Sequence, residues 1–477
     1  MNDATRFETV PTIAEASRLI ETRALSPVEL TELCLKRIGA VDARLNSFLL
    51  VTETLARKTA KRAEAEIAAG RRRGPLHGIP IGLKDIYSTK GIRTTAHSKV
   101  LAEHVPDKDA VVTAKLAKAG TVLLGKLSTH EFAIGGPSFD LPWPPARNPW
   151  NTELSPGGSS SGSGGAIAAG LVLGATGSDT GGSIRSPATF CAIAGVKPTY
   201  GLVSRSGILP LAFTLDHAGP MAWTVEDCAI LLQAMAGHDK ADPGSAKVKI
   251  PDFRAALRQD LKGVRVGVIN RWHEGEHPVE PEMKQAVEAA AETMRGLGAE
   301  IRDVAMPGLA DFAPAGRVII LTEAFAVHQK TLQSRYNDYG ERFRASVTPA
   351  ALFSAADHMQ AIRARRQLIE RTAEAMAGID VMVVAAAPGP ATKMVGFDPD
   401  AAFKRPLLTM PFNLTGLPVA TVCCGFTGSN LPLGMQVVGH PFGDATAMAV
   451  AHAYERATSW RSRRPPLFAE ASAQTAR

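Results

Sequence analysis

Two serines that each follow a pair of glycines are the residues of this chain best suited to do chemistry. They are Ser159 and Ser183, 24 positions apart, with a short apolar stretch between them. A serine hydroxyl attacks a carbonyl carbon when a base takes its proton, and neighbouring glycines leave backbone N–H groups free to bind the resulting oxyanion. The pattern therefore indicates acyl transfer, with Ser183 as the candidate nucleophile. The candidate oxyanion hole consists of the backbone N–H groups of Thr180, Gly181, Gly182 and Ser183.

A serine nucleophile needs a base, and the histidines of this chain are poorly placed to supply one. Only His217 lies close in sequence to the two serines. A lysine can replace histidine when burial or a nearby positive charge lowers its pKa toward neutrality. Lys84 ends the apolar stretch Gly78–Lys84, whose β-branched residues and flanking turns predict a strand. Lys84 is therefore the candidate base.

Two other motif matches lack a residue that their chemistry requires. Gly120–Lys126 resembles a phosphate-binding loop, but Leu127 stands where a Ser or Thr should bind magnesium. His130-Glu131 begins like a zinc-protease helix, but Ile134 replaces the second histidine. We therefore expect no metal ion and no cofactor.

Two alternative interpretations of the Gly/Ser block fit the sequence less well. The segment Gly158–Gly162 matches the nucleophile elbow of α/β-hydrolases with Ser160 as nucleophile, but the residues before it, Asn151–Pro156, do not resemble a strand. A flexible Gly/Ser linker would not contain the apolar stretch Ala166–Leu173.

Composition excludes several classes of protein. The chain has 477 residues, 45% of them hydrophobic, and a net charge of +7, so it can bury a large core. Its densest basic runs, Arg71–Arg73 and Arg461–Arg464, lack interleaved aromatic residues, which argues against nucleic-acid binding. The five scattered cysteines indicate reduced core residues. With neither a signal segment nor an apolar span of membrane length, we expect a cytoplasmic protein with no membrane contact.

The elements around these residues alternate between helix and strand. Thr12–Glu15 and Ser26–Glu29 are capping boxes that predict two helices, and the Ala-rich segment Thr52–Gly70 predicts a third. Further helices are expected over 110–118 and 282–295, and further strands over 122–124, 264–269 and 381–385. This alternation predicts an α/β fold with a central mixed, mostly parallel β-sheet flanked by helices on both faces. Since no flexible linker is visible, residues 1–477 are expected to form a single domain.

Several further blocks of the sequence have distinctive patterns. They are Gly74–Asp85, Asn148–Asn151, the Gly/Ser block through Cys191, Gly195–Arg205, Leu215–Pro220 and Met410–Pro418. Together these blocks resemble the amidase signature family. The resemblance implies that N-terminal helices span about 10–70, the signature core about 74–225 and a C-terminal completion about 226–470. Two departures from the family pattern are Ala192, where glycine is frequent, and Trp223, where arginine is frequent.

The resemblance also implies a set of functional residues. The family's Ser-cisSer-Lys triad corresponds to Ser183 as nucleophile, Ser159 as bridging serine after a cis peptide bond, and Lys84 as base. Asp179 and Arg185 flank the nucleophile, and we expect them to pair and hold its loop.

The implied function is hydrolysis of the C–N bond of a small-molecule amide through an acyl-enzyme. An aryl or alkyl amide and a carbamate both fit, because the acyl-transfer chemistry is shared. The segment 135–148 is similar to bacterial amidases near the carboxybiuret hydrolases, so a urea derivative is an alternative substrate. The candidate substrate pocket is lined by Ile134, Gly135, Phe139 and Trp143.

Two rival functions stay open. One is that of an amidotransferase A-type subunit, which would act as a glutaminase for tRNA-dependent amidation and work with other chains. The other, of a different class, is a non-catalytic nucleic-acid-binding protein, which the scattered charge disfavours. A homodimer is compatible with the sequence.

Overall fold

The computed structural model describes residues 10–275, 278–396 and 407–475. Its strands are β1 (Phe48–Val51), β2 (Pro80–Lys84), β3 (Val122–Leu127), β4 (Gly174–Asp179), β5 (Ala194–Lys197), β6 (His217–Ala222), β7 (Arg265–Val268), β8 (Glu300–Asp303), β9 (Val381–Ala385), β10 (Val419–Phe426) and β11 (Pro432–Gly439). The α-helices of the first half are α1 (Ile13–Glu21), α2 (Pro27–Leu45), α3 (Glu53–Ala68), α4 (Val111–Lys118), α5 (Ser161–Ala168), α6 (Arg185–Phe190) and α7 (Val225–Met235). Those of the second half are α8 (Arg271–Glu274), α9 (Pro281–Gly296), α10 (Leu309–Arg335), α11 (Glu341–Val347), α12 (Ala355–Ala375), α14 (Pro411–Leu414), α15 (Asp444–Ala457) and α16 (Pro466–Thr475). Short 3-10 turns lie at Lys99–Leu101, Glu131–Ala133, Tyr336–Asp338, Thr348–Leu352 and Trp460–Ser462.

The local signals in the sequence place the N-terminal helices correctly. Thr12 and Ser26 each form a complete capping box, and Pro27 opens α2. The Ala-rich segment forms α3, and the strands expected near Lys84 and over 381–385 are β2 and β9. These elements depend on caps and apolar runs that are visible without tertiary context.

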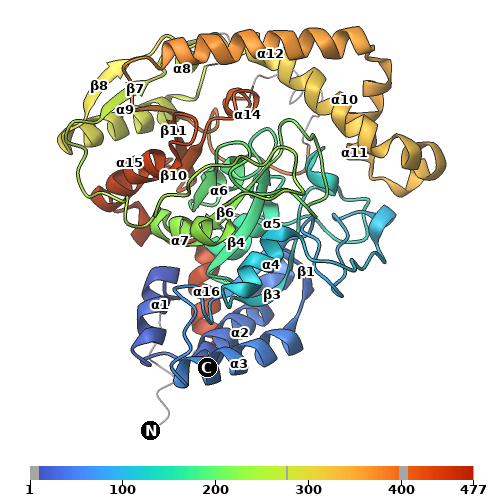
Figure 1. Ribbon diagram of the computed structural model, residues 1–477, viewed down its shortest axis with the longest axis vertical. Helices are drawn as coiled ribbons and strands as arrows, with labels where there is room; N and C mark the ends of the chain where they lie inside the picture. The colour runs from blue at the N-terminus through green and yellow to red at the C-terminus, as the bar shows by residue number, and fades with distance from the viewer. Residues whose placement is uncertain (1–9, 276–277, 397–406, 476–477) are drawn as a thin grey trace.

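One mixed sheet runs through the described residues. Its strand order is β1-β3-β2-β4-β6-β5-β10-β11-β9-β7-β8. Figure 1 shows this sheet between the helices, with α1, α2, α3 and α16 gathered at one end and α10, α11 and α12 at the other. The expected α/β class with a central mixed sheet is confirmed.

Parallel pairing does not predominate, which corrects one detail of the expected fold. Four strand pairs are parallel, namely β2 with β3 and β4, and β7 with β8 and β9. The other six described pairs are antiparallel. The central strands cause the difference, because β10 and β11 form a hairpin and β6 returns antiparallel to both β4 and β5.

Helices cover both faces of the sheet, as β4 illustrates. A side chain at Gly174 would meet Leu231 of α7, whereas one at Gly177 would meet Ser160 and Ile184. Residues three apart on a strand point to opposite faces. Helix α7 therefore covers one face of β4, and the segments that begin α5 and α6 cover the other.

The parallel pairing of β2 with β4 determines where the candidate base lies. Ile81 is in register with Gly174 and Gly82 with Ala175, so Lys84 at the end of β2 lies beside the end of β4. The carboxyl ends of neighbouring parallel strands are a common position for functional side chains in α/β sheets.

Candidate active site

Lys84 is completely buried and touches two serine hydroxyls. Its Nζ lies 2.7 Å from Ser159 Oγ and 2.8 Å from Ser178 Oγ. Its backbone N–H donates to Thr176 Oγ1 at 3.0 Å, which fixes the end of β2 against β4. The amine is therefore held at one position by two strands.

Burial lowers the pKa of Lys84 to about 7, and the negative charges of Asp179 and Asp216 oppose that shift. A lysine with this pKa is largely neutral slightly above pH 7, and a neutral amine can accept a proton. The geometry and the pKa thus make Lys84 chemically able to act as a base toward Ser159.

Ser159 lies in a tight turn before α5. The Gly158–Ser159 peptide bond is cis. The Ser159 carbonyl accepts hydrogen bonds from the backbone N–H groups of His130 at 3.1 Å and Ser161 at 2.8 Å. A side chain at position 158 would lie only 1.9 Å from His130 Cε1, so the turn requires glycine there.

Ser183 lies at the boundary between the buried pair and the solvent. It is half-buried, whereas Ser159 and Lys84 are buried. The backbone N–H of Ser160 donates to the Ser183 carbonyl at 3.2 Å, which brings the two glycine-flanked segments together. Ser160 itself is fully buried and hydrogen-bonds to the backbone of Ser178, so it has no exposed hydroxyl for an elbow-type reaction.

The four backbone N–H groups of the candidate oxyanion hole are not equivalent. Gly182 N–H donates to Asp179 Oδ1 at 2.9 Å, so it points at a carboxylate rather than at open space. The N–H groups of Thr180, Gly181 and Ser183 have no acceptor among the residues that the structure describes. Three of the four groups are therefore free to bind an oxyanion.

Asp179 and Arg185 pair at 2.8 Å, and both are completely buried. Burial alone would raise the pKa of Asp179, but the charge and hydrogen bonds of Arg185 hold it below its usual range. Asp179 also accepts hydrogen bonds from the N–H groups of Gly182 and Ile184. Arg185 in turn donates to the Thr409 carbonyl, Gln436 and Asn413. The pair thus ties the Ser183 loop to the C-terminal segment.

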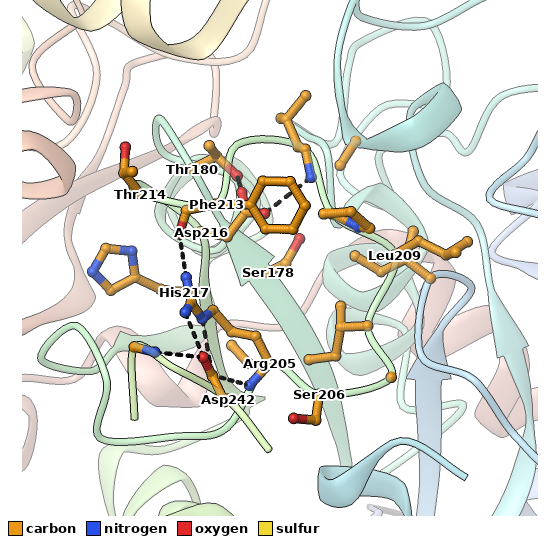
Figure 2. Close-up of a pocket in the computed structure, with 18 of the residues that line it drawn as sticks. Ser178, Thr180, Arg205, Ser206, Leu209, Phe213, Thr214, Asp216, His217 and Asp242 are labelled. Carbon is orange, nitrogen blue, oxygen red and sulfur yellow. Dashed lines mark hydrogen bonds and ion pairs between the residues drawn. The ribbon is translucent and has the colours of Figure 1, made fainter. Parts of the chain in front are cut away.

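A pocket of about 630 Å³ adjoins these residues. Figure 2 shows side chains of segment 205–217 around the pocket, together with those of Ser178 and Thr180. None of the four residues expected to line the substrate pocket lines it. Phe139 is 53% exposed, Trp143 lies near Arg93 and His97, and Ile134 packs on the core. A side chain at Gly135 would meet the backbone of Arg342.

Two residues of the site, Ser178 and Asp216, are not among the candidates drawn from the sequence. Ser178 contacts Lys84, and Asp216 contacts Thr180. Ser178 lies two positions after Thr176 on β4, and both contact Lys84. Alternate residues of a strand share a face, so two hydroxyl residues at this spacing are the sequence signal that could have indicated a polar contact on this face. Asp216 accepts a hydrogen bond from Thr180 Oγ1 at 2.6 Å, a contact made across 36 positions that no local pattern marks.

Within the described part of the chain, no group of three or more His, Cys, Asp or Glu side chains could hold a metal ion. None of the described helices combines the length and the apolar character needed to cross a membrane.

Comparison with known proteins identifies the family. The Amidase family model matches residues 29–448. The A-type chain of the glutamyl-tRNA(Gln) amidotransferase of Geobacter metallireducens is 40% identical over 482 residues, covering 95% of this chain and 98% of the relative. The chain therefore belongs to the amidase signature family, and it is an enzyme of the class that hydrolyses C–N bonds.

Solved structures of the family share its architecture. Native peptide amidase from Stenotrophomonas maltophilia matches with a TM-score of 0.84 and 31% identity, covering 96% of this chain and 99% of its own. A vestigial protein complex described as revealing the origins of an s-triazine catabolic enzyme matches with a TM-score of 0.87 and 31% identity, over 94% of this chain and 98% of the other.

Proposed function

We propose that this enzyme hydrolyses a carboxamide through an acyl-enzyme on Ser183, with Ser159 as proton relay and Lys84 as base. The observation that carries the proposal is the 2.7 Å contact between Lys84 Nζ and Ser159 Oγ, made by an amine whose pKa burial lowers to about 7. Ser183 is half-buried, and its carbonyl accepts a hydrogen bond from the N–H of Ser160, the residue after Ser159.

The acylation step needs only proton transfers between the three side chains and the substrate. Ser183 Oγ bonds to the amide carbonyl carbon while its proton passes to Ser159 Oγ and the Ser159 proton passes to Lys84 Nζ. The C–N bond then breaks, and the proton returns by the same route to the leaving nitrogen. Water repeats the sequence on the ester, which releases the carboxylic acid and restores the Ser183 hydroxyl.

The tetrahedral intermediate of each step carries a negative oxygen. The free N–H groups of Thr180, Gly181 and Ser183 are suited to bind it, while Gly182 N–H stays with Asp179 and shapes the loop. Each such donor contributes roughly 10²–10³-fold to the rate in comparable hydrolases.

Two classes of substrate are candidates for this reaction. The curated relatives are named as A-type chains of a glutamyl-tRNA(Gln) amidotransferase, which favours glutamine as the amide donor and function with partner chains over the stand-alone small-molecule amidase. A pocket lined mostly by apolar side chains favours the second candidate, an uncharged amide, carbamate or urea derivative.

Ammonia release by the purified chain distinguishes the two. Glutaminase activity that rises when the other chains of an amidotransferase are added would support the first candidate. Efficient hydrolysis of anilides or simple amides by the isolated chain, unaffected by those chains, would support the second. Salt-dependent binding to nucleic acid with no hydrolysis of any amide would contradict both.

A further inference from the structure

Two residues that line the pocket connect it to the candidate catalytic groups. Ser178, whose Oγ contacts Lys84 Nζ, and Thr180 of the candidate oxyanion loop both line it. Its volume of about 630 Å³ falls within the usual range for sites that bind small molecules. The pocket therefore adjoins the loop that carries Ser183 and a hydroxyl that contacts Lys84.

The walls of the pocket are predominantly apolar. The larger apolar side chains that line it include Ile86, Ile208, Leu209, Leu211 and Phe213. Figure 2 shows Leu209 and Phe213 among the side chains that line the pocket. Apolar walls favour an apolar occupant, because the surface that both partners remove from water drives binding.

The cation of the pocket is already neutralised. Arg205 pairs with Asp242 through two hydrogen bonds of 2.6 and 3.0 Å. It also donates to the Tyr200 hydroxyl at 2.8 Å and to the Phe213 carbonyl. A substrate carboxylate would have to compete with Asp242 for this guanidinium.

The remaining ionisable groups are likewise occupied. Asp216 accepts hydrogen bonds from Thr180 Oγ1, Leu211 N–H and Ala212 N–H. Burial lowers the pKa of His217 well below its usual value, so its ring is neutral. Among the described residues that line the pocket, Arg205 is therefore paired with Asp242, and Asp216 is hydrogen-bonded to three donors of the protein.

Phe213 lines the pocket from a loop whose backbone is hydrogen-bonded to its neighbours. Its side chain is 58% exposed. Its own carbonyl accepts from the Tyr200 hydroxyl, and the next residue, Thr214, is bound through N–H and Oγ1 by Glu323 of α10. An aromatic ring that is held in place without being buried is suited to cover an apolar ligand.

We infer that the pocket takes the acyl group of an uncharged, apolar carboxamide, and that a free α-amino acid such as glutamine is a poor substrate. This inference rests on the proposed function, because it names the substrate class of the same site. Glutamine would bring its carboxylate to a guanidinium that Asp242 already neutralises, and its ammonium among apolar walls where the Asp216 carboxylate is already hydrogen-bonded to three donors. Desolvating a charge without a free partner is costly.

A homologous series of amides tests the inference. Ammonia release is measured for acetamide, butyramide and hexanamide, and for L-glutamine. We expect kcat/KM to rise roughly fourfold per added methylene until the pocket is filled, and hexanamide to exceed glutamine by roughly 100-fold. A flat series, or glutamine as the better substrate, would overturn the inference.

Two variants locate the effect in this pocket. Phe213→Ala removes an exposed ring, so the fold is expected to survive, and it should reduce the hexanamide to acetamide ratio of kcat/KM several-fold. Leu352→Ala is the matched control, since Leu352 is an 88% exposed apolar residue of another pocket. An equal effect of both variants on the ratio would contradict the assignment.

Binding to the Ser183→Ala variant separates this inference from the proposed function. Calorimetric titration compares hexanamide with L-glutamine without requiring catalysis. Tighter binding of hexanamide than of glutamine supports the pocket assignment, whether or not the wild-type chain hydrolyses either compound. Failure of the wild-type chain to hydrolyse both compounds would overturn only the proposed function. Preference for glutamine overturns the pocket assignment whatever the activity.

Discussion

Burial, and not a neighbouring cation, makes Lys84 suited to act as a base. The same burial makes its pKa sensitive to each nearby charge, and Asp179 and Asp216 both raise it. Asp179 is bound by Arg185, whereas Asp216 is bound only by neutral groups. Asp216 is therefore the charge that can be removed with less disturbance.

The pH profile tests this electrostatic account. Lys84 is protonated below its pKa of about 7, so kcat/KM should rise with pH through that value. Asp216→Asn removes a negative charge that favours the ammonium form, so the pKa of Lys84 should fall and the acid limb should move to lower pH. Asp107→Asn, at an exposed carboxylate, is the control and should leave the limb in place.

A limb that stays fixed in Asp216→Asn, or activity that is constant down to pH 5, would contradict this account. The limb position is informative because Asp216 also holds Thr180, and loss of that contact alone would lower kcat without moving the limb.

The buried ion pair between Asp179 of β4 and Arg185 of α6 stabilises the loop that carries Ser183. Arg185→Met would leave Asp179 buried without its partner charge, and such changes cost about 3–5 kcal/mol. Equilibrium urea unfolding should show this loss as a lower midpoint. A decrease of under about 1 kcal/mol would indicate that Asn413 and the loop N–H groups suffice to stabilise Asp179.

The turn after α6 carries a residue with a strained backbone. Ala192, where the family often has glycine, has φ +53°, in the left-handed region that disfavours side chains. Ala192→Gly should raise the free energy of unfolding by about 0.5–1 kcal/mol, since relief of strain exceeds the added chain entropy. Ala119→Gly, at φ −68°, should instead lower it. Equal effects of the two substitutions would contradict the explanation.

Local signals in the sequence predict individual elements well, but they do not reveal the pocket. Lys84 at the end of an apolar strand and the glycine-flanked serines could be selected from residue types alone. The pocket is assembled from segments that include residues near 86, 133, 200–218 and 241–244. The position of the segment 200–218 depends on the pairing of β4 with β6 and on the hydrogen bond that Thr214 N–H donates to Glu323. Antiparallel pairing between strands distant in the sequence is likewise invisible to local signals, and for that reason the expectation of a mostly parallel sheet is wrong.

At the scale of the whole molecule, Arg37 joins three distant parts of the chain. From α2 it donates to the carbonyls of Ala169 and Gly170, just after α5, and to that of Phe468 in α16. Figure 1 shows α16 lying among the N-terminal helices. The helix that follows Ser159 is thus anchored to both ends of the chain.

Arg37→Met should lower the free energy of unfolding by about 3 kcal/mol or more, because buried carbonyls lose their donor. Arg44→Met is the matched control, since Arg44 also links α2 to α16 but through an exposed ion pair with Glu470. That substitution should cost about 1 kcal/mol or less. Similar losses in both variants, measured by urea unfolding, would refute the role given to Arg37.

The most direct test of the central claim is to identify the residue that becomes acylated. The wild-type enzyme is treated with a fluorophosphonate, and the modified peptide is located by mass spectrometry. We predict one adduct, on Ser183, that is absent from Ser183→Ala, while the variant loses roughly 10³-fold or more in kcat. An adduct on Ser159 or Ser160, or full activity in Ser183→Ala, would contradict the account.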